Sequence, residues 1–208
     1  IWTGIQTITW TANDADGDVL TMDIQKGIDT GDGVNWEDIS LGETNDGSYS
    51  WDTTTTIDSN SYLIRVMAFD GQLTSQDDSD TKFTVDNNPP DTSVLNPSIE
   101  PFNFDYYYIN GIVKVKAFVI DEASGIDNIQ FTMTDNDVNE LSCIGLQDEI
   151  DNSLWSCEID TKELSDSNGQ TYDLVITITD NAGNAVTEFY SDWDYYFDID
   201  NTPPTTSL

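Results

Sequence analysis

The sequence predicts an all-β chain in which two Greek-key β-sandwich modules follow one another, joined by a short Pro-Pro linker. Two observations carry this prediction: the alternation of apolar and polar residues, and an internal repeat. Alternating runs occupy both halves of the chain, and turn clusters such as Asp16–Asp18 and Asn45–Gly47 separate them. No stripe with a 3.6-residue period competes with this alternation. Several short strands within roughly 90 to 110 residues are typical of one sandwich.

The internal repeat sets the module boundaries. The segments Phe83–Val94 and Phe197–Leu208 read almost the same, and each contains Asp-Asn-x-Pro-Pro. The first copy leads directly into new strand-forming sequence, so the second copy is expected to open another module. We therefore place module one at residues 1–88, module two at residues 89–202, and the start of a truncated third module at residues 203–208.

Further landmarks recur within the modules in the same order. A half-buried strand that ends in an acidic turn is expected at Ile8–Asp14 and again at Val115–Asp121. The remaining pairs are a short motif at Trp51–Thr53 and Ile159–Thr161, and a longer alternating strand at Tyr62–Asp70 and Tyr172–Asp180. Landmarks that match in one order favour two copies of one fold.

The charge of the chain restricts its partners. Forty Asp and Glu residues stand against six Lys and Arg, which gives a formal net charge of -34. Nucleic acids and anionic membranes are therefore excluded as partners, and cations are favoured because they relieve the self-repulsion. A second interpretation assigns most of these carboxylates to a solvated acidic surface that keeps the protein soluble at high salt.

The two cysteines, Cys143 and Cys157, lie on two short strand-like runs. We expect a single disulfide that closes a hairpin, with two free thiols as the alternative. A disulfide favours an oxidising, extracellular location. The sequence has no signal peptide and no run of about 18 apolar residues, so we expect its ends to be boundaries within a larger protein and expect no direct membrane contact.

The residue types needed for common catalytic sites are missing from the sequence. The chain contains no His, which removes Ser-His-Asp and Cys-His arrangements and His-ligated zinc. It also lacks a Gly-x-Ser-x-Gly motif and a phosphate-binding Gly-rich loop. We therefore predict that the protein is not an enzyme. A hydrolase with paired carboxylates stays as a third hypothesis, because some of 40 acidic residues will lie close together by accident.

A tyrosine opens the long alternating strand of each module, at Tyr62 and Tyr172, and each strand ends in Asp-Gly or Asp-Asn-Ala-Gly-Asn. This pattern resembles strand F of immunoglobulin-like and fibronectin-type-III-like modules, in which the tyrosine forms the tyrosine corner. The Asp-Asn-x-Pro-Pro linker is similar to those joining immunoglobulin-like and cadherin-like repeats in bacterial and archaeal surface proteins. The resemblance implies an architecture and a cell-surface location rather than an activity.

In such a sandwich the BC and FG loops of module two face the linker from module one. We therefore expect calcium at this junction, since clustered Asp and Asn oxygens suit it. The candidate ligands are Asp86, Asn87, Asn88 and Asp91 in the linker, Asp121, Glu122 and Asp127 in the BC loop, and Asp180, Asn181 and Asn184 in the FG loop. The arrangement resembles cadherin junctions, although the linker departs from the cadherin Asp-x-Asn-Asp-Asn pattern. Proline alone, through Pro89-Pro90, is the alternative source of stiffness.

By the same logic, incomplete sites are expected at the two outer ends. The candidates are Asp14, Asp16, Asp18 and Asp70 in module one, and Asp198, Asp200 and Asn201 at the end of module two. The alternating acids at Asp14–Asp18 are not an EF-hand, because Val19 stands where Gly is required and Gln25 where Glu is required. A solvated turn explains them equally well.

Three functions remain after these exclusions. The first is a structural segment of a surface layer, stalk, filament or adhesin, whose partners are neighbouring modules, cations and identical subunits of a surface array. The second is a binding module that holds a glycan or protein through the aromatic runs Tyr106–Tyr108 and Trp193–Phe197. A core role for the second run is favoured, because five apolar residues share one parity: Phe189, Trp193, Tyr195, Phe197 and Ile199. The third is the hydrolase.

Overall fold

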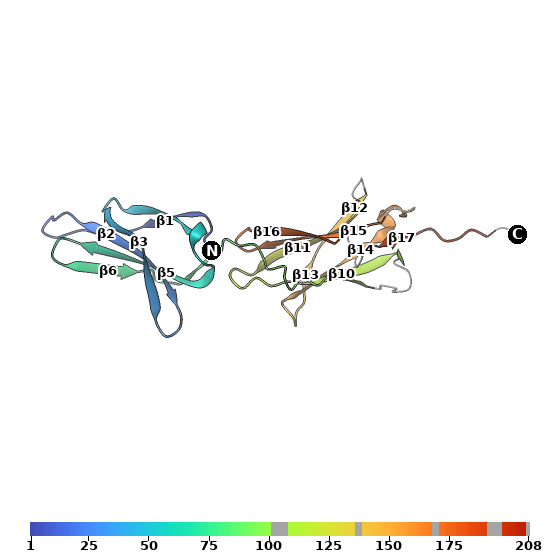
Figure 1. The fold of residues 1–208 in the computed structure, drawn as a ribbon, viewed down its shortest axis with the longest axis horizontal. Helices are drawn as coiled ribbons and strands as arrows, with labels where there is room; N and C mark the ends of the chain where they lie inside the picture. The colour runs from blue at the N-terminus through green and yellow to red at the C-terminus, as the bar shows by residue number, and fades with distance from the viewer. Residues whose placement is uncertain (101–107, 136–138, 168–170, 191–196, 207–208) are drawn as a thin grey trace. The chain divides into compact units, whose positions relative to one another are not determined.

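The computed structural model describes residues 1–100, 108–135, 139–167, 171–190 and 197–206. The described chain is built from β-strands and two single-turn 3₁₀ helices (Figure 1). It divides into two compact units, of which the first is Ile1–Asn88 with Glu122–Ser124 and the second is Pro89–Asp121 with Gly125–Leu208. Below, module one denotes residues 1–88 and module two denotes residues 89–202, the bounds expected from the sequence.

Module one is a sandwich of two unequal sheets. Its elements are β1 (Ile5–Thr9), β2 (Thr21–Asp29), β3 (Val34–Thr44), β4 (Ser48–Asp52), η1 (Thr53–Thr55), β5 (Ser59–Phe69), β6 (Thr74–Asp78) and β7 (Phe83–Val85). One sheet has the order β3-β2-β5-β6, with β7 also paired to β5, and the other contains β1 and β4 (Figure 1). The inward positions of both sheets form the core: Ile8, Ile24, Trp51, Tyr62, Ile64 and Val85.

Module two repeats this design with two four-stranded sheets and one two-stranded sheet. Its elements are β8 (Ser98–Glu100), β9 (Tyr108–Ile109), β10 (Ile112–Phe118), β11 (Ile126–Thr134), β12 (Glu140–Ile144), β13 (Leu146–Gln147), β14 (Leu154–Asp160), η2 (Thr161–Glu163), β15 (Asp173–Asp180), β16 (Ala185–Tyr190) and β17 (Asp198–Ile199). The sheets have the orders β13-β14-β10-β8 and β12-β11-β15-β16, and β17 pairs with β9 in parallel. Alternate residues such as Val115, Phe131 and Ile176 are fully buried between them.

The two modules correspond strand by strand. β1, β4, β2, β3, β5 and β6 take the places of β10, β14, β11, β12, β15 and β16, with Ile5 facing Asp52 as Ile112 faces Asp160. Short 3₁₀ turns follow the same strand in both modules, since Asp52 and Asp160 each cap the turn with a carboxylate oxygen. The predicted immunoglobulin-like Greek-key sandwich, present twice, is thereby confirmed.

The two tyrosine corners are also confirmed. The hydroxyl of Tyr62 donates to the carbonyl of Ile57 at 2.8 Å, and the hydroxyl of Tyr172 donates to the carbonyl of Ser165 at 3.0 Å. Both side chains are 1% exposed, so each ring adds to the core while its hydroxyl fixes the loop before the strand. The same residue type therefore serves packing and loop geometry at equivalent positions.

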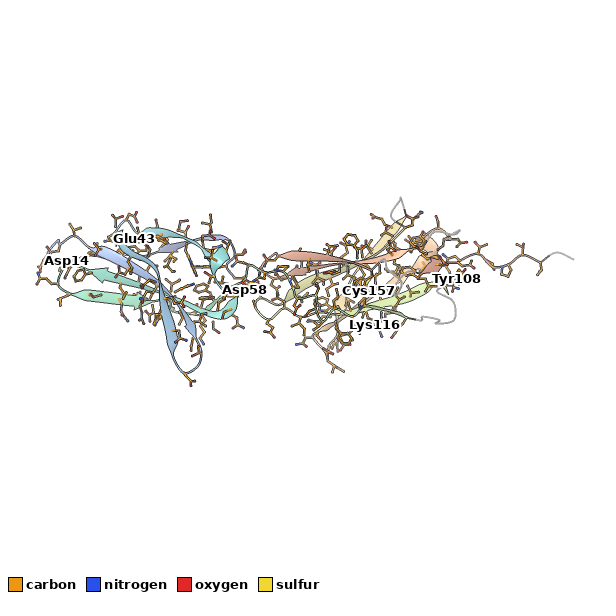
Figure 2. The ribbon with its side chains drawn as sticks, viewed as in Figure 1. Asp14, Glu43, Asp58, Tyr108, Lys116 and Cys157 are labelled. Atoms are coloured by element: carbon orange, nitrogen blue, oxygen red, sulfur yellow. A yellow bond between two sulfur atoms is a disulfide. The ribbon has the colours of Figure 1, made fainter. Side chains whose placement is uncertain are left out.

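The disulfide between Cys143 and Cys157 is formed, but it does not close a hairpin. Cys143 lies on β12 and Cys157, which Figure 2 labels, lies on β14, and these strands belong to opposite sheets of module two. The chain crosses from one sheet to the other at Gly145, directly before β13. The expectation of a hairpin was wrong because it assumed that two short neighbouring runs pair with each other.

The predicted final strand is also different from the one observed. Phe197 and Ile199 are 1% exposed and belong to the core, as expected from their parity. Phe189 is 67% exposed, because Val186 and Tyr190 are the residues of β16 that pack against the core. Trp193 and Tyr195, and the start of the Tyr106–Tyr108 run, lie outside the described residues.

We predict that Tyr62→Phe destabilises module one by about 1 to 2 kcal/mol, because the carbonyl of Ile57 loses its donor. Burial, followed by the charges of Glu37 and Asp58, raises the pKa of Tyr62 to about 12. An unfolded tyrosine ionises near pH ~10, so this residue's contribution is complete below that pH and is lost as the pH rises toward the folded pKa.

Urea unfolding between pH 7 and 12 measures both effects. The wild-type chain is expected to lose more stability above pH ~10 than Tyr62→Phe does. Tyr49→Phe, a half-buried tyrosine of β4, is the matched control. Parallel pH profiles for the wild-type protein and Tyr62→Phe would contradict the expectation.

Candidate functional site

The end of module one is fixed by the side chain of Asn87, two residues beyond β7. Its carboxamide oxygen accepts hydrogen bonds from the backbone of Gly4 at 2.9 Å and from the hydroxyls of Thr3 and Thr53 at 3.2 Å. Its amide group donates to the carbonyl of Thr53 at 2.9 Å, and its backbone N–H donates to Asp58 at 2.9 Å. We call Gly4, Thr53, Asp58 and Asn87 the asparagine anchor of module one.

The end of module two is fixed in the same way by Asn201. Its carboxamide oxygen accepts from the backbone of Gly111 at 3.4 Å and from the hydroxyl of Thr161 at 3.2 Å, and its amide donates to the carbonyl of Thr161 at 2.8 Å. Its backbone N–H donates to Asp166 at 2.7 Å. Gly111, Thr161, Asp166 and Asn201 are the asparagine anchor of module two.

Each anchor joins three distant parts of one sandwich. Gly4 and Gly111 have φ values of 64° and 67°, a conformation that glycine adopts without strain, and each carbonyl accepts from the threonine of the same anchor. In module two the Asp166 carboxylate also accepts from the hydroxyl of Thr202, and this bond, with that from Asn201, lowers the pKa of Asp166. The chain therefore leaves each module from a fixed point.

The BC and FG loops of module two lie side by side. The backbone N–H of Gly125 donates to Asp121 at 2.7 Å, and the N–H of Asn181 donates to the carbonyl of Gly125 at 2.9 Å. Carboxylate oxygens of Asp121 and Asp180 consequently lie within 4.8 Å of one another. The fold thus brings together two predicted carboxylate ligands from different loops.

Asp180 also shapes the FG loop itself. One carboxylate oxygen accepts from the backbone of Ala182 and Asn184 at 2.8 Å, and the other accepts from the Asn184 side chain at 2.9 Å. The side chain is 1% exposed, and none of the four ion pairs found among the described residues includes it. A buried carboxylate near a second carboxylate is stabilised by such donors and by a cation.

The remaining linker and loop candidates have other surroundings. Asp91 is exposed and accepts from the backbone and hydroxyl of Ser93, and these bonds lower its pKa. Asn88 donates to Asp58, and Asp86, which is 1% exposed, accepts from the backbone of Asn88 at 3.3 Å. Asp127 and Asn181 are exposed, and Glu122 is exposed as well.

The outer candidates form turns. Asp14 accepts from the backbone of Asp16 and Asp18, and Asp70 accepts from the backbone of Gln72 and Leu73. Asp14 lies at the end of module one opposite Asp58 and its anchor (Figure 2). Asp198 is half-buried, and Asp200 is exposed and accepts from Thr202. Within the described part of either module taken by itself, no three acidic side chains bring oxygens within 4.8 Å of one another.

Sequence reasoning missed four members of the anchors. Asn87 and Asn201 were expected to face a cation, whereas their carboxamide oxygens accept bonds within their own modules. The partners Gly4, Asp58, Gly111 and Asp166 were not singled out. A signal was available, because Gly4 and Gly111 each stand four residues before the strand landmark that begins at Ile8 or Val115. Asp58 and Asp166 each stand five residues after the threonine that ends the other short landmark.

The chain is similar in structure to repeat regions of large adhesins. A tetra-tandem repeat in the extending region of a large adhesion protein shows 16% identity and a TM-score of 0.44, covering 96% of this chain and 50% of that chain. A Ca²⁺-stabilized adhesin that helps an Antarctic bacterium reach out and bind ice shows 17% identity and a TM-score of 0.40, covering 96% and 45%. The chain thus spans about half of each adhesin chain.

A third similar structure contains the FN1–FN3 domains of chicken CNTN1, with 12% identity, a TM-score of 0.37, and coverage of 91% of this chain and 65% of that chain. No protein family model and no curated protein matches the sequence. Among the described residues, no helix has the length and apolar character needed to cross a membrane. The assignment of each module as a sandwich rests on its own strand order.

We predict that Asn87→Ala destabilises module one by about 2 to 4 kcal/mol, because the Gly4 N–H and the Thr53 carbonyl both lose a partner. Asn201→Ala should have the same effect on module two. Thermal unfolding of the chain measures both changes. Asn13→Ala, at an exposed position, is the control and should change stability by less than about 0.5 kcal/mol. Equal losses for Asn87→Ala and Asn13→Ala would contradict the role of the anchor.

Proposed function

We propose that this chain is a non-catalytic structural segment of an extracellular surface protein, in which modules repeated in tandem act as a spacer. The observation that carries the proposal is the asparagine anchor, which is built from the same four residue types in both modules. It fixes the point where the chain leaves one module for the next. A protein whose purpose is to maintain a distance needs such fixed exits, whereas an isolated binding module does not.

The entry into module two is fixed as well. The backbone N–H of Asp91 donates to the carbonyl of Ile120 at 3.1 Å, and its carboxylate holds Ser93. Only Asn88, Pro89 and Pro90 separate this residue from Asn87. The prolines restrict the backbone to extended conformations, and four peptide units span at most about 14 Å. The covalent linker therefore supports a joint with few accessible conformations.

We further propose that calcium binds where the linker reaches the loops of module two, with Asp86, Asp121 and Asp180 as its carboxylate ligands. The support is the proximity of the Asp121 and Asp180 oxygens and the position of Asp86 five residues before the fixed Asp91. Asp86 is an acid that is 1% exposed, in a chain with six basic residues. Calcium would neutralise these charges and prefers such oxygens. The anchored Asn87 is left out of this ligand set.

Calorimetric titration of the chain with calcium at physiological salt tests the site. We expect saturable binding with a Kd of about 0.1 to 1 mM, the range of extracellular modules. Asp180→Asn keeps most of the hydrogen-bond geometry of the loop but removes a charge, so it should weaken binding by roughly tenfold or more. Asp32→Asn, on an exposed turn, is the control. Identical weak binding by both variants would show diffuse attraction instead of a site.

Small-angle scattering tests the spacer function separately. With calcium, the distribution of distances within the particle should be narrow, and a chelator should broaden it. Magnesium at the same concentration controls for ionic strength, because magnesium binds such a site less readily than calcium does. Broad distributions in every condition would contradict a spacer, while narrow ones in every condition would assign the stiffness to the prolines and remove calcium from the proposal.

A further inference from the structure

Strand β1 of module one has an open edge that its counterpart in module two does not have. β10 pairs with β14 on one side and with β8 on the other, where Ile99 faces Val115. β1 pairs with β4, and among the described residues no strand pairs with its second edge. Ile8 corresponds to Val115, so the position opposite Ile8 is the one that Ile99 fills in module two.

A groove of about 940 Å³ lies along this open edge. One wall is β1 with its continuation to Asp14, the other wall is β6, and the floor is formed by inward residues of β2 and β5. Its apolar lining includes Trp10, Ala12, Met22, Val66, Ala68 and Leu73. The groove therefore opens directly onto the core of module one.

The exposure of the lining residues shows that the core is incomplete there. Four of them are only half-buried, whereas the corresponding residues of module two are 0–1% exposed. The pairs are Trp10 with Ala117, Ala12 with Val119, Val66 with Ile176, and Ala68 with Ile178. Apolar area left in contact with water disfavours this state, and covering it would be favourable.

Residues 91–100 cover the equivalent surface in module two. Asp91 pairs with Ile120 at one end, Leu95 packs against the core, and Ile99 is 7% exposed opposite Val115. This segment lies alongside β10 and its continuation, from Lys114 to Ile120. The equivalent stretch of module one runs from Thr7 to Asn13. Each residue from Thr7 to Asp14 lines the groove. The groove thus matches the footprint of residues 91–100.

We propose that the groove of module one is a β-strand-binding site, whose occupant is an extended polypeptide segment with the chemistry of residues 91–100. The segment runs antiparallel to β1 and places an aliphatic side chain against Ile8, with polar residues on either side as in β8. It reaches the groove from the N-terminal side of Trp2. Trp2 is the counterpart of Ile109, because Trp2 pairs in parallel with Val85 as Ile109 pairs with Ile199. In module two the covering strand β8 precedes Ile109 in the chain, so the equivalent segment would precede Trp2.

The experiment places a copy of residues 91–107 directly before Ile1 of the 208-residue chain. The number of residues between the copied Ile99 and Trp2 then equals the number between the original Ile99 and Ile109. We expect the melting temperature of module one to rise by about 5 °C or more. Hydrogen exchange at the open-edge amides of Thr7–Asn13 should slow on the order of tenfold or more, because they gain backbone partners. Tryptophan fluorescence should shift to shorter wavelength as Trp10 becomes buried.

The control is the same extension with Asp at the two positions copied from Leu95 and Ile99. It has the same length and can form the same backbone bonds, but it cannot fill the apolar groove, so it should give neither the exchange protection nor the fluorescence shift. Equal protection by both extensions, or by neither, would overturn the proposal. Protection of these amides in the unextended chain only at concentrations where light scattering detects a dimer would also overturn it, since the occupant would be a second copy.

Discussion

The hydrogen bonds of two asparagine side chains determine how each module is closed. Asn87 and Asn201 each satisfy a glycine N–H and a threonine carbonyl that lie far away in sequence, so the last strand, the start of the sandwich and its middle meet at one residue. A carboxamide is suited to this position because it donates and accepts at once without carrying a charge. In a chain of net charge -34, a neutral side chain avoids further repulsion at a crowded corner.

The abundance of aspartate has a local explanation beside any cation site. Many Asp carboxylates accept a hydrogen bond from the backbone N–H two residues later, as Asp52, Asp70 and Asp148 do. Backbone hydrogen bonds lower the pKa of all three carboxyl groups, since they favour the charged form. The largest effect comes from the N–H of Thr54 on Asp52, of Leu73 on Asp70 and of Asp151 on Asp148. Glutamate is too long for this turn geometry. Part of the negative charge is therefore a consequence of how the loops between strands are made.

The parts of the fold that follow a period of two were predictable from the sequence. Core residues such as Tyr62, Ile64, Leu174 and Ile176 lie on the expected face, because a strand between two sheets must alternate. The disulfide crossing and the exposed Phe189 were not predictable, because both depend on which sheet a short strand joins. The roles of Asn87 and Asn201 were also hidden, since a polar residue beside acidic residues suggests a ligand until its hydrogen-bond partners are known.

The disulfide of module two bears on how the two modules would respond to a pulling force. Cys143 and Cys157 are separated by 14 positions, and the bond between them holds opposite sheets together. If module two were unravelled from its ends, the enclosed segment would stay folded back behind the bond, which removes roughly 50 Å from the length that the chain can reach. Module one has no such bond, because its sequence contains no cysteine. Two sandwiches with the same strand order would therefore extend to different lengths under the same load.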